Sequence, residues 1–263
     1  MVLLLVLGCQ RGLQEVDPRL LYAGLTSGPI SPVIDPAPRH PGDVRDLPNC
    51  GGRNFEPPVR GAFSSQENRL LAKASTPQIE LFDQIVRQRE SLRADVVVKY
   101  GEEPLREDWL RVFIGGCGGW GQVTEVRTDQ EGRAKIAMRQ RLPPGIYGLV
   151  VQVVGDASTT RAEIWVLPEE TELRSKGITA AMVQGEGASG EEQGEKKFTP
   201  GVLVVYVDRD AHSLKSSLPA LRARLRGDGY PVGPILGPQE WSALESTEIF
   251  EQTEEGSNEM IRR

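Results

Sequence analysis

The sequence is poor in histidine and cysteine, and it has no excess of positive charge. Its 263 residues include two histidines and three cysteines, too few for a disulfide-dense scaffold or for the usual His/Cys zinc site. No apolar run reaches about 18 residues, which excludes an ordinary transmembrane helix. The net charge is −6 and the pI is about 5.2. A general nucleic-acid binder needs a basic surface, so we expect no nucleic-acid partner.

Glycine and proline are abundant instead. The chain has 29 glycines and 19 prolines, which predicts many turns and at least one linker. Nine of the prolines lie in residues 10–60. Because proline at this density blocks helices and sheet ladders, we predict that residues 10–60 form an extended, mostly disordered spacer.

Residues 1–9 read MVLLLVLGC, an aliphatic run followed by a small residue and a cysteine. This run is similar to the end of a bacterial lipoprotein signal, which implies that Cys9 is lipidated after cleavage and attaches the chain to a membrane. The basic segment that normally precedes such a run is missing. Two interpretations remain: an exported protein, envelope-attached or secreted, with a shortened signal, or a cytoplasmic protein with a chance apolar N-terminus.

The other two cysteines, Cys50 and Cys117, form an even pair. In an oxidising compartment they are candidates for a disulfide, although the sequence does not fix their pairing. A nucleophilic role for Cys117 is disfavoured, because no histidine lies near it in the sequence.

Residues 61–93 are predicted to form a helical lead-in. Apolar residues recur at helical spacing between positions 79 and 86. The dipeptide Thr76-Pro77 is a good helix entry, because proline is favoured at the first helical position. Together these signals favour a short helix over about 77–90.

Residues 94–168 have the pattern of an antiparallel β-sandwich. Short apolar or β-branched runs follow one another at about ten-residue spacing, with turn residues between them. We interpret the acidic residues 102, 103, 107 and 108 as a solvated loop. The predicted strands are Asp95–Tyr100, Trp109–Ile114, Val123–Thr128, Ala134–Met138, Ile146–Val154 and Thr160–Leu167.

The rest of the chain is predicted to contain one small α/β segment. Residues 169–199 are rich in Glu, Gly and Lys without apolar periodicity, so we expect a flexible loop. Within 200–240, a strand over 202–207, a helix over 214–226 and a weak strand over 230–236 predict a βαβ unit. Residues 241–263 are acidic and then basic, and we expect a frayed tail.

The candidate for chemistry is Asp208-Arg209-Asp210, which directly follows the strand over 202–207. Carboxylates at the carboxyl end of a parallel strand lie where open α/β sheets bind their ligands. Asp208 and Asp210 could share a Mg²⁺ ion, or act as nucleophile and general acid. The alternative is structural, because acidic residues often begin such a loop and Asp210 or Ser213 can cap the following helix.

Two stretches resemble known families. The turn over 128–132 and the run Leu142-Pro143-Pro144-Gly145-Ile146-Tyr147 look like the repeated pattern of immunoglobulin-like and transthyretin-like exported modules. This resemblance implies a structural or binding unit. Together with the segment that follows, it gives the predicted fold class: mixed, with an antiparallel immunoglobulin-like β-sandwich followed by a small or incomplete α/β (βαβ) domain.

A sandwich that ends in Ile164-Trp165-Val166-Leu167-Pro168 before an α/β segment also resembles bacterial relatives of the lipin-type phosphatases, in the haloacid dehalogenase superfamily. That family hydrolyses phosphate esters with Mg²⁺ and has an Asp-x-Asp-Gly-Thr motif soon after the sandwich. Here Glu and Thr follow Pro168, and Ala211-His212 stands after Asp210 in place of Gly-Thr. Alternatively, the run over 204–209 corresponds to a later family strand, which puts Asp208 where the family binds phosphate with a threonine. The resemblance implies a relative that has lost activity.

The leading hypothesis is a non-catalytic, exported or envelope-attached binding or scaffold protein, with a partner in the envelope or outside the cell and no cofactor. Its C-terminal segment would be a degenerate haloacid-dehalogenase-like remnant. The alternative is a Mg²⁺-dependent phosphatase acting on phosphate esters such as phosphatidate, with Asp208 and Asp210 as the catalytic and metal-binding residues.

Overall fold

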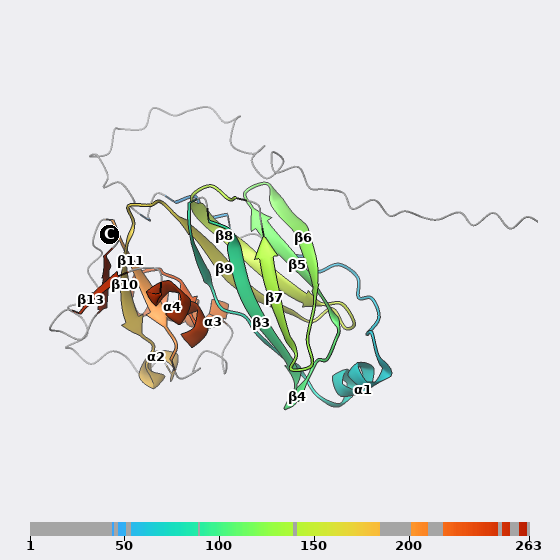
Figure 1. The fold of residues 1–263 in the computed structure, drawn as a ribbon. Helices are drawn as coiled ribbons and strands as arrows, with labels where there is room; N and C mark the ends of the chain where they lie inside the picture. The colour runs from blue at the N-terminus through green and yellow to red at the C-terminus, as the bar shows by residue number, and fades with distance from the viewer. Residues whose placement is uncertain are drawn as a thin grey trace, which may run out of the picture.

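The chain forms a β-sandwich and a smaller C-terminal unit, which lie side by side (Figure 1). Helix α1 (Gln66–Ala74) lies at the end of the sandwich that is remote from the C-terminal unit. The structure is a computed structural model, and it describes residues 44, 47–50, 54–88, 90–138, 141–184, 201–209, 218–246, 249–252 and 258–261.

Two sheets make up the sandwich, which confirms that part of the predicted fold class. In the first sheet, β3 (Leu92–Tyr100) pairs with β1 (Pro77–Glu80), β4 (Glu103–Pro104) and β7 (Arg133–Met138). The second sheet has the order β2 (Gln84–Arg87), β9 (Thr159–Leu167), β8 (Gly145–Val153), β5 (Trp109–Gly116) and β6 (Gly119–Arg127). All these pairs are antiparallel except β2 with β9, which is parallel.

The sandwich core follows from alternation along the strands. Every second residue of β3 is buried, from Leu92 to Tyr100, and β7 alternates in the same way, as strands with one solvated face do. β8 differs, because all nine of its residues are buried. Its inner face packs inside the sandwich, so its outer face must also be covered. Part of that cover comes from the segment that precedes α1, and part comes from the C-terminal unit.

The helix predicted over 77–90 is wrong. This stretch forms two strands, β1 and β2, which belong to different sheets of the sandwich. The apolar residues of two short strands that face one core from opposite sides imitate helical spacing. The helix of the lead-in lies earlier, at α1, where the Ser65 hydroxyl accepts a hydrogen bond from the Asn68 N–H (3.0 Å) and caps the first turn.

The spacer prediction is wrong for residues 47–50 and 54–60. These residues lie on the sandwich: the Cys50 N–H donates to the Ile146 carbonyl and the Ile146 N–H donates to the Pro48 carbonyl, both at 2.8 Å. Further along, the side chain of Gln152 donates to the Pro58 carbonyl. We call residues 47–50 and 54–61 the strap. Residues 10–43 lie outside the described residues.

The C-terminal unit is built on a five-stranded sheet that mixes parallel and antiparallel pairs. The strand order is β12 (Ile235–Leu236), β11 (Val202–Val207), β10 (Glu172–Gly177), β14 (Asn258–Ile261) and β13 (Ile249–Gln252). β10, β11 and β12 are parallel, and β14 and β13 are antiparallel to their neighbours. The helices are α2 (Ala180–Gln184), α3 (Leu218–Gly227) and α4 (Pro238–Glu245).

Several elements of the C-terminal unit lie where the sequence predicted irregular structure. β10 and α2 fall in the predicted loop 169–199. The second half of α4 and the β13–β14 hairpin fall in the predicted tail 241–263. β10 has few apolar residues but pairs with both β11 and β14, so its position depends on its neighbours rather than on its own pattern. Residues 185–200 lie outside the described residues.

Candidate functional site

Asp208 lies at the carboxyl end of β11, as the sequence predicted, and it is buried. Its N–H donates to the Leu236 carbonyl (2.9 Å), which ties it to the neighbouring parallel strand β12. Asp210 and Cys9 lie outside the described residues. In the described part of the chain, no group of three or more His, Cys, Asp or Glu side chains could hold a metal ion. The described residues therefore do not assemble a Mg²⁺ site around Asp208.

A buried ionic cluster joins the two parts of the chain. Asp83, in the connection between β1 and β2, is fully buried, and its carboxylate accepts from the N–H groups of Glu163 and Ile235, both at 2.7 Å. The Arg222 Nη2 atom lies 2.7 and 2.9 Å from the two oxygens of Asp83. The Arg222 Nη1 atom also lies 3.0 Å from Glu163 Oε1. One carboxylate thus contacts β9 of the sandwich and α3 and β12 of the C-terminal unit.

Burial and charge act against each other in this cluster. Burial raises the pKa of Glu163, and the nearby Arg222 opposes that rise. Burial alone would lower the pKa of Arg222, but the two carboxylates outweigh it and raise that pKa. The Arg222 guanidinium is therefore held in its charged form beside Asp83 and Glu163 at the junction.

A second contact fixes the connection between the sandwich and the C-terminal unit. Arg87, at the end of β2, is buried, and its Nη1 atom donates to the carbonyls of Thr171 (2.8 Å) and Pro168 (3.2 Å). These carbonyls belong to the link between β9 and β10. Apolar packing completes the junction. One cluster joins sandwich and C-terminal residues: Val44, Ile146, Trp165, Leu167, Leu173, Leu203, Val205, Val207, Leu236 and Trp241.

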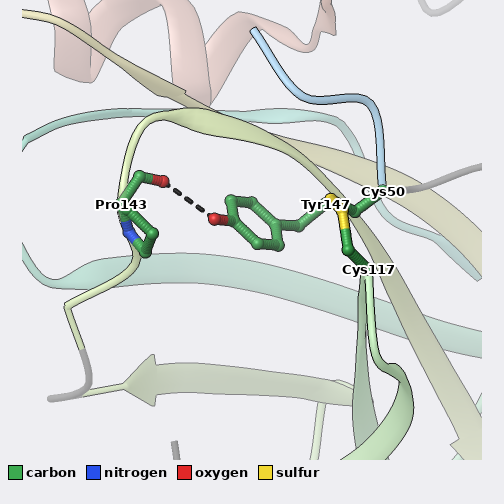
Figure 2. The surroundings of a disulfide bond; sticks show 4 residues. All are labelled: Cys50, Cys117, Pro143 and Tyr147. Carbon is green, nitrogen blue, oxygen red and sulfur yellow. Dashed lines mark hydrogen bonds between the residues drawn. A yellow bond between two sulfur atoms is a disulfide. The ribbon is translucent and has the colours of Figure 1, made fainter. Parts of the chain in front are cut away.

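The disulfide between Cys50 and Cys117 attaches the strap to the turn between β5 and β6 (Figure 2). The two Cα atoms are 4.5 Å apart. Tyr147 lies beside the disulfide, and its hydroxyl donates to the Pro143 carbonyl at 2.9 Å. A tyrosine near the start of a strand that bonds back to the preceding corner is typical of immunoglobulin-like sandwiches. The motif that carried the first resemblance therefore has a structural role here.

Aromatic residues gather where the strap crosses the sandwich. The ring centroid of Phe55, from the strap, lies 5.0 Å from that of Phe113 and 5.0 Å from that of Trp120. The Trp120 ring lies over Gly148 and Gly115, where a Cβ atom would overlap it. The Arg161 guanidinium lies 5.1 Å from the Trp120 ring centroid. Glycine at these two positions leaves the space on the sheet that the tryptophan ring occupies.

Asp108 is buried, which corrects the prediction that it belongs to a solvated loop. Its carboxylate accepts from the Ser64 N–H and hydroxyl, from the Asn68 Nδ2 atom (2.8 Å) and from the Trp109 N–H (2.8 Å). These bonds tie the start of α1 to β5. One sequence signal for this role exists, the Ser64-Ser65 pair before α1, but no pattern indicates that Asp108 is the acceptor.

Replacing Asp108 with asparagine is expected to lower the free energy of unfolding by about 2 kcal/mol. The asparagine amide would place N–H donors against the donors that now surround a carboxylate, and each buried group left without an acceptor costs about 1–3 kcal/mol. Urea unfolding followed by circular dichroism measures the change. Glu131→Gln, at an exposed turn, is the matched control. Equal stability of the two variants would contradict this role for Asp108.

The second prediction concerns pH. Burial, and then the charge of Asp95, raises the pKa of Glu240 in α4. The folded state therefore favours the protonated form. This contribution to stability is complete below the pKa of an unfolded glutamate, about 4.3, and is lost as the pH rises through the raised pKa. The Glu240→Gln variant should thus gain in melting temperature relative to the wild type between pH 4.5 and pH 7. A difference in melting temperature between the two proteins that stays constant from pH 4.5 to pH 7 would contradict this prediction.

No family model matches the chain, and no curated protein matches its sequence. Among solved structures, the chain is similar to a chimeric titin Z1Z2 at 19% identity, with 36% of this chain and 98% of that chain covered and a TM-score of 0.25. It is also similar to the CARDB domain of the PF1109 protein from Pyrococcus furiosus, at 13% identity, 44% and 99% coverage and a TM-score of 0.27. It is similar to murine CRIg at 9% identity, with 35% of this chain and 98% of that chain covered and a TM-score of 0.25.

The strand order of the chain itself defines the class. β9, β8, β5 and β6 lie in one sheet and β1, β3 and β7 in the other, which is the arrangement of an immunoglobulin-like β-sandwich. The fold alone does not specify an activity.

Proposed function

We propose that this chain is a non-catalytic binding or scaffold protein that is exported and works attached to the cell envelope or outside the cell. The immunoglobulin-like sandwich supports a binding or scaffold role, because such sandwiches present side chains on a rigid framework. The C-terminal unit is packed onto this framework by the ionic cluster around Asp83 and by an apolar cluster, so the two parts would act as one body.

The observation that carries the proposal is the disulfide between Cys50 and Cys117. Disulfides persist in oxidising compartments and are rare in the cytosol of most cells. This disulfide joins residues 67 positions apart and fixes the strap to the sandwich. No helix in the described part of the chain is long and apolar enough to cross a membrane. A lipid on Cys9, followed by the spacer that precedes the strap, would supply the attachment.

Differential thiol labelling in the native cells tests the compartment. Free thiols are alkylated in intact cells, the protein is then reduced, and newly released thiols are labelled with a second reagent. We expect Cys50 and Cys117 to carry the second label, and Cys9→Ser to move the protein from the membrane fraction to the soluble fraction. Labelling of both Cys50 and Cys117 by the first reagent would contradict export.

The Mg²⁺-dependent phosphatase alternative retains one supporting observation, the position of Asp208 at the carboxyl end of a buried parallel strand. We propose instead that the C-terminal unit is an inactive α/β remnant. Phosphate release from an aryl phosphate and from phosphatidate, with and without Mg²⁺, separates the two functions. We expect no difference between the wild type and Asp208→Asn. Metal-dependent release that Asp208→Asn abolishes would establish the phosphatase and overturn the binding proposal.

A further inference from the structure

The strap lies on the sandwich as a bound peptide would. Of residues 54–61, only Phe55 is partly buried, and the other seven are exposed. The sheet surface beneath the strap is buried, because Phe113 on β5 and Val150 and Gln152 on β8 are all buried. A strand of the core would be buried on at least one face, whereas this segment contributes one aromatic side chain and its backbone.

The contacts are those of peptide recognition. Phe55 is the anchor, placed between the rings of Phe113 and Trp120. The backbone supplies the rest: the Pro58 carbonyl accepts from Gln152 Nε2 at 3.0 Å and the Val59 carbonyl accepts from Arg111 Nη1 at 3.3 Å. An extended segment with prolines is already ordered before it binds, so it loses little entropy on docking.

One polar atom of this face is left over. Gln152 is fully buried, and its Oε1 atom has no hydrogen-bond partner among the described residues. Since its Nε2 atom donates to a carbonyl, the orientation of the amide is fixed by that bond. The strap at this point consists of Pro57 and Pro58, neither of which has an N–H to donate. The strap therefore satisfies only half of the Gln152 side chain.

We propose that the outer face formed by Arg111, Phe113, Trp120 and Gln152 is a peptide-binding face. The strap occupies it in the free molecule, and a partner protein displaces the strap with an extended segment of the same chemistry. That segment carries an aromatic anchor and, three and four residues later, backbone carbonyls for Gln152 and Arg111. The disulfide holds Cys50, and the Gly61 N–H donates to the Val154 carbonyl at 2.7 Å, so residues 54–59 can leave the face while the chain stays attached at both ends. This inference rests on the proposed binding function and names the kind of partner.

A competition experiment with the full-length protein tests this face. The probe is a fluorescent peptide with the strap sequence 54–61, Asn-Phe-Glu-Pro-Pro-Val-Arg-Gly. The receptor is Phe55→Ala, which removes the anchor of the attached strap. We expect it to bind the probe at least tenfold more tightly than the wild type does, because the attached strap competes at a high effective concentration. A probe with alanine in place of phenylalanine should bind neither protein, and Arg111→Ala in the Phe55→Ala background should weaken binding.

Probe binding to Phe55→Ala that is no stronger than that of the alanine probe would overturn the proposal, provided that circular dichroism shows a folded protein. Hydrogen exchange of the variant and trypsin cleavage of the wild type provide a second measurement. Millimolar probe should slow the exchange of the Phe55→Ala sandwich but also speed trypsin cleavage of the wild type after Arg60, next to the displaced residues, and unchanged cleavage at a concentration that saturates Phe55→Ala would also overturn it. Thiol labelling in cells tests export separately, so failure of the peptide face and failure of the proposed location are distinguishable.

Discussion

Replacing Arg222 with alanine is expected to lower the free energy of unfolding by about 3–5 kcal/mol, the usual cost of removing one partner of a buried ion pair. Arg222 is 11% exposed and its partner Asp83 is 0% exposed. Without the guanidinium, Asp83 keeps two N–H donors, from Glu163 and Ile235, but no positive charge. A buried carboxylate in that state must either protonate or admit water, and both cost free energy.

The matched control for this variant is Arg226→Ala, on the same helix but exposed to solvent. Urea unfolding measures global stability, and hydrogen exchange shows where the loss occurs. We expect Arg222→Ala to loosen α3 and β12 before the sandwich, because Asp83 joins these elements to β9. A loss for Arg222→Ala within about 0.5 kcal/mol of the Arg226→Ala loss would show that the cluster does not hold the junction.

The sandwich could be predicted from the sequence because each of its longer strands carries its own pattern of buried and exposed residues. In β3 and β7 the apolar residues alternate, and turn residues separate the strands. The predicted strand over 134–138 differs from β7 by one residue, and the one over 160–167 differs from β9 by one residue. A half-buried strand carries its own pattern, whatever it pairs with.

The errors arise where position depends on distant residues. β1 and β2 are four residues each, too short for a period of two to be told from a helical period. The strap looks like a linker by composition, and only the disulfide, Phe55 and the hydrogen-bonding side chains of the sheet fix it. Proline content reports which structures a segment excludes, not whether a surface elsewhere in the chain receives it.

The candidate chemistry divides in the same way. The position of Asp208 at the end of a strand followed from the apolar run before it. The sequence did not indicate that Asp83, Glu163 and Arg222 meet. Glu163 lies 80 residues from Asp83 along the chain, and Arg222 lies 139 residues from it. Isolated acidic and basic residues on separate elements are indistinguishable from surface residues until the elements pack.

Replacing Cys50 and Cys117 together with serine is expected to lower the free energy of unfolding by about 4 kcal/mol. The disulfide closes a loop between residues 67 positions apart, and the entropy that a cross-link of this length removes from the unfolded chain corresponds to about 4 kcal/mol. Thermal and urea unfolding of the wild type in a dithiol reductant should reproduce the loss, while the double variant should not respond to the reductant. Cys9→Ser is the control for the remaining thiol. A double variant as stable as the oxidised wild type would mean that Phe55 and the backbone hydrogen bonds hold the strap without the disulfide.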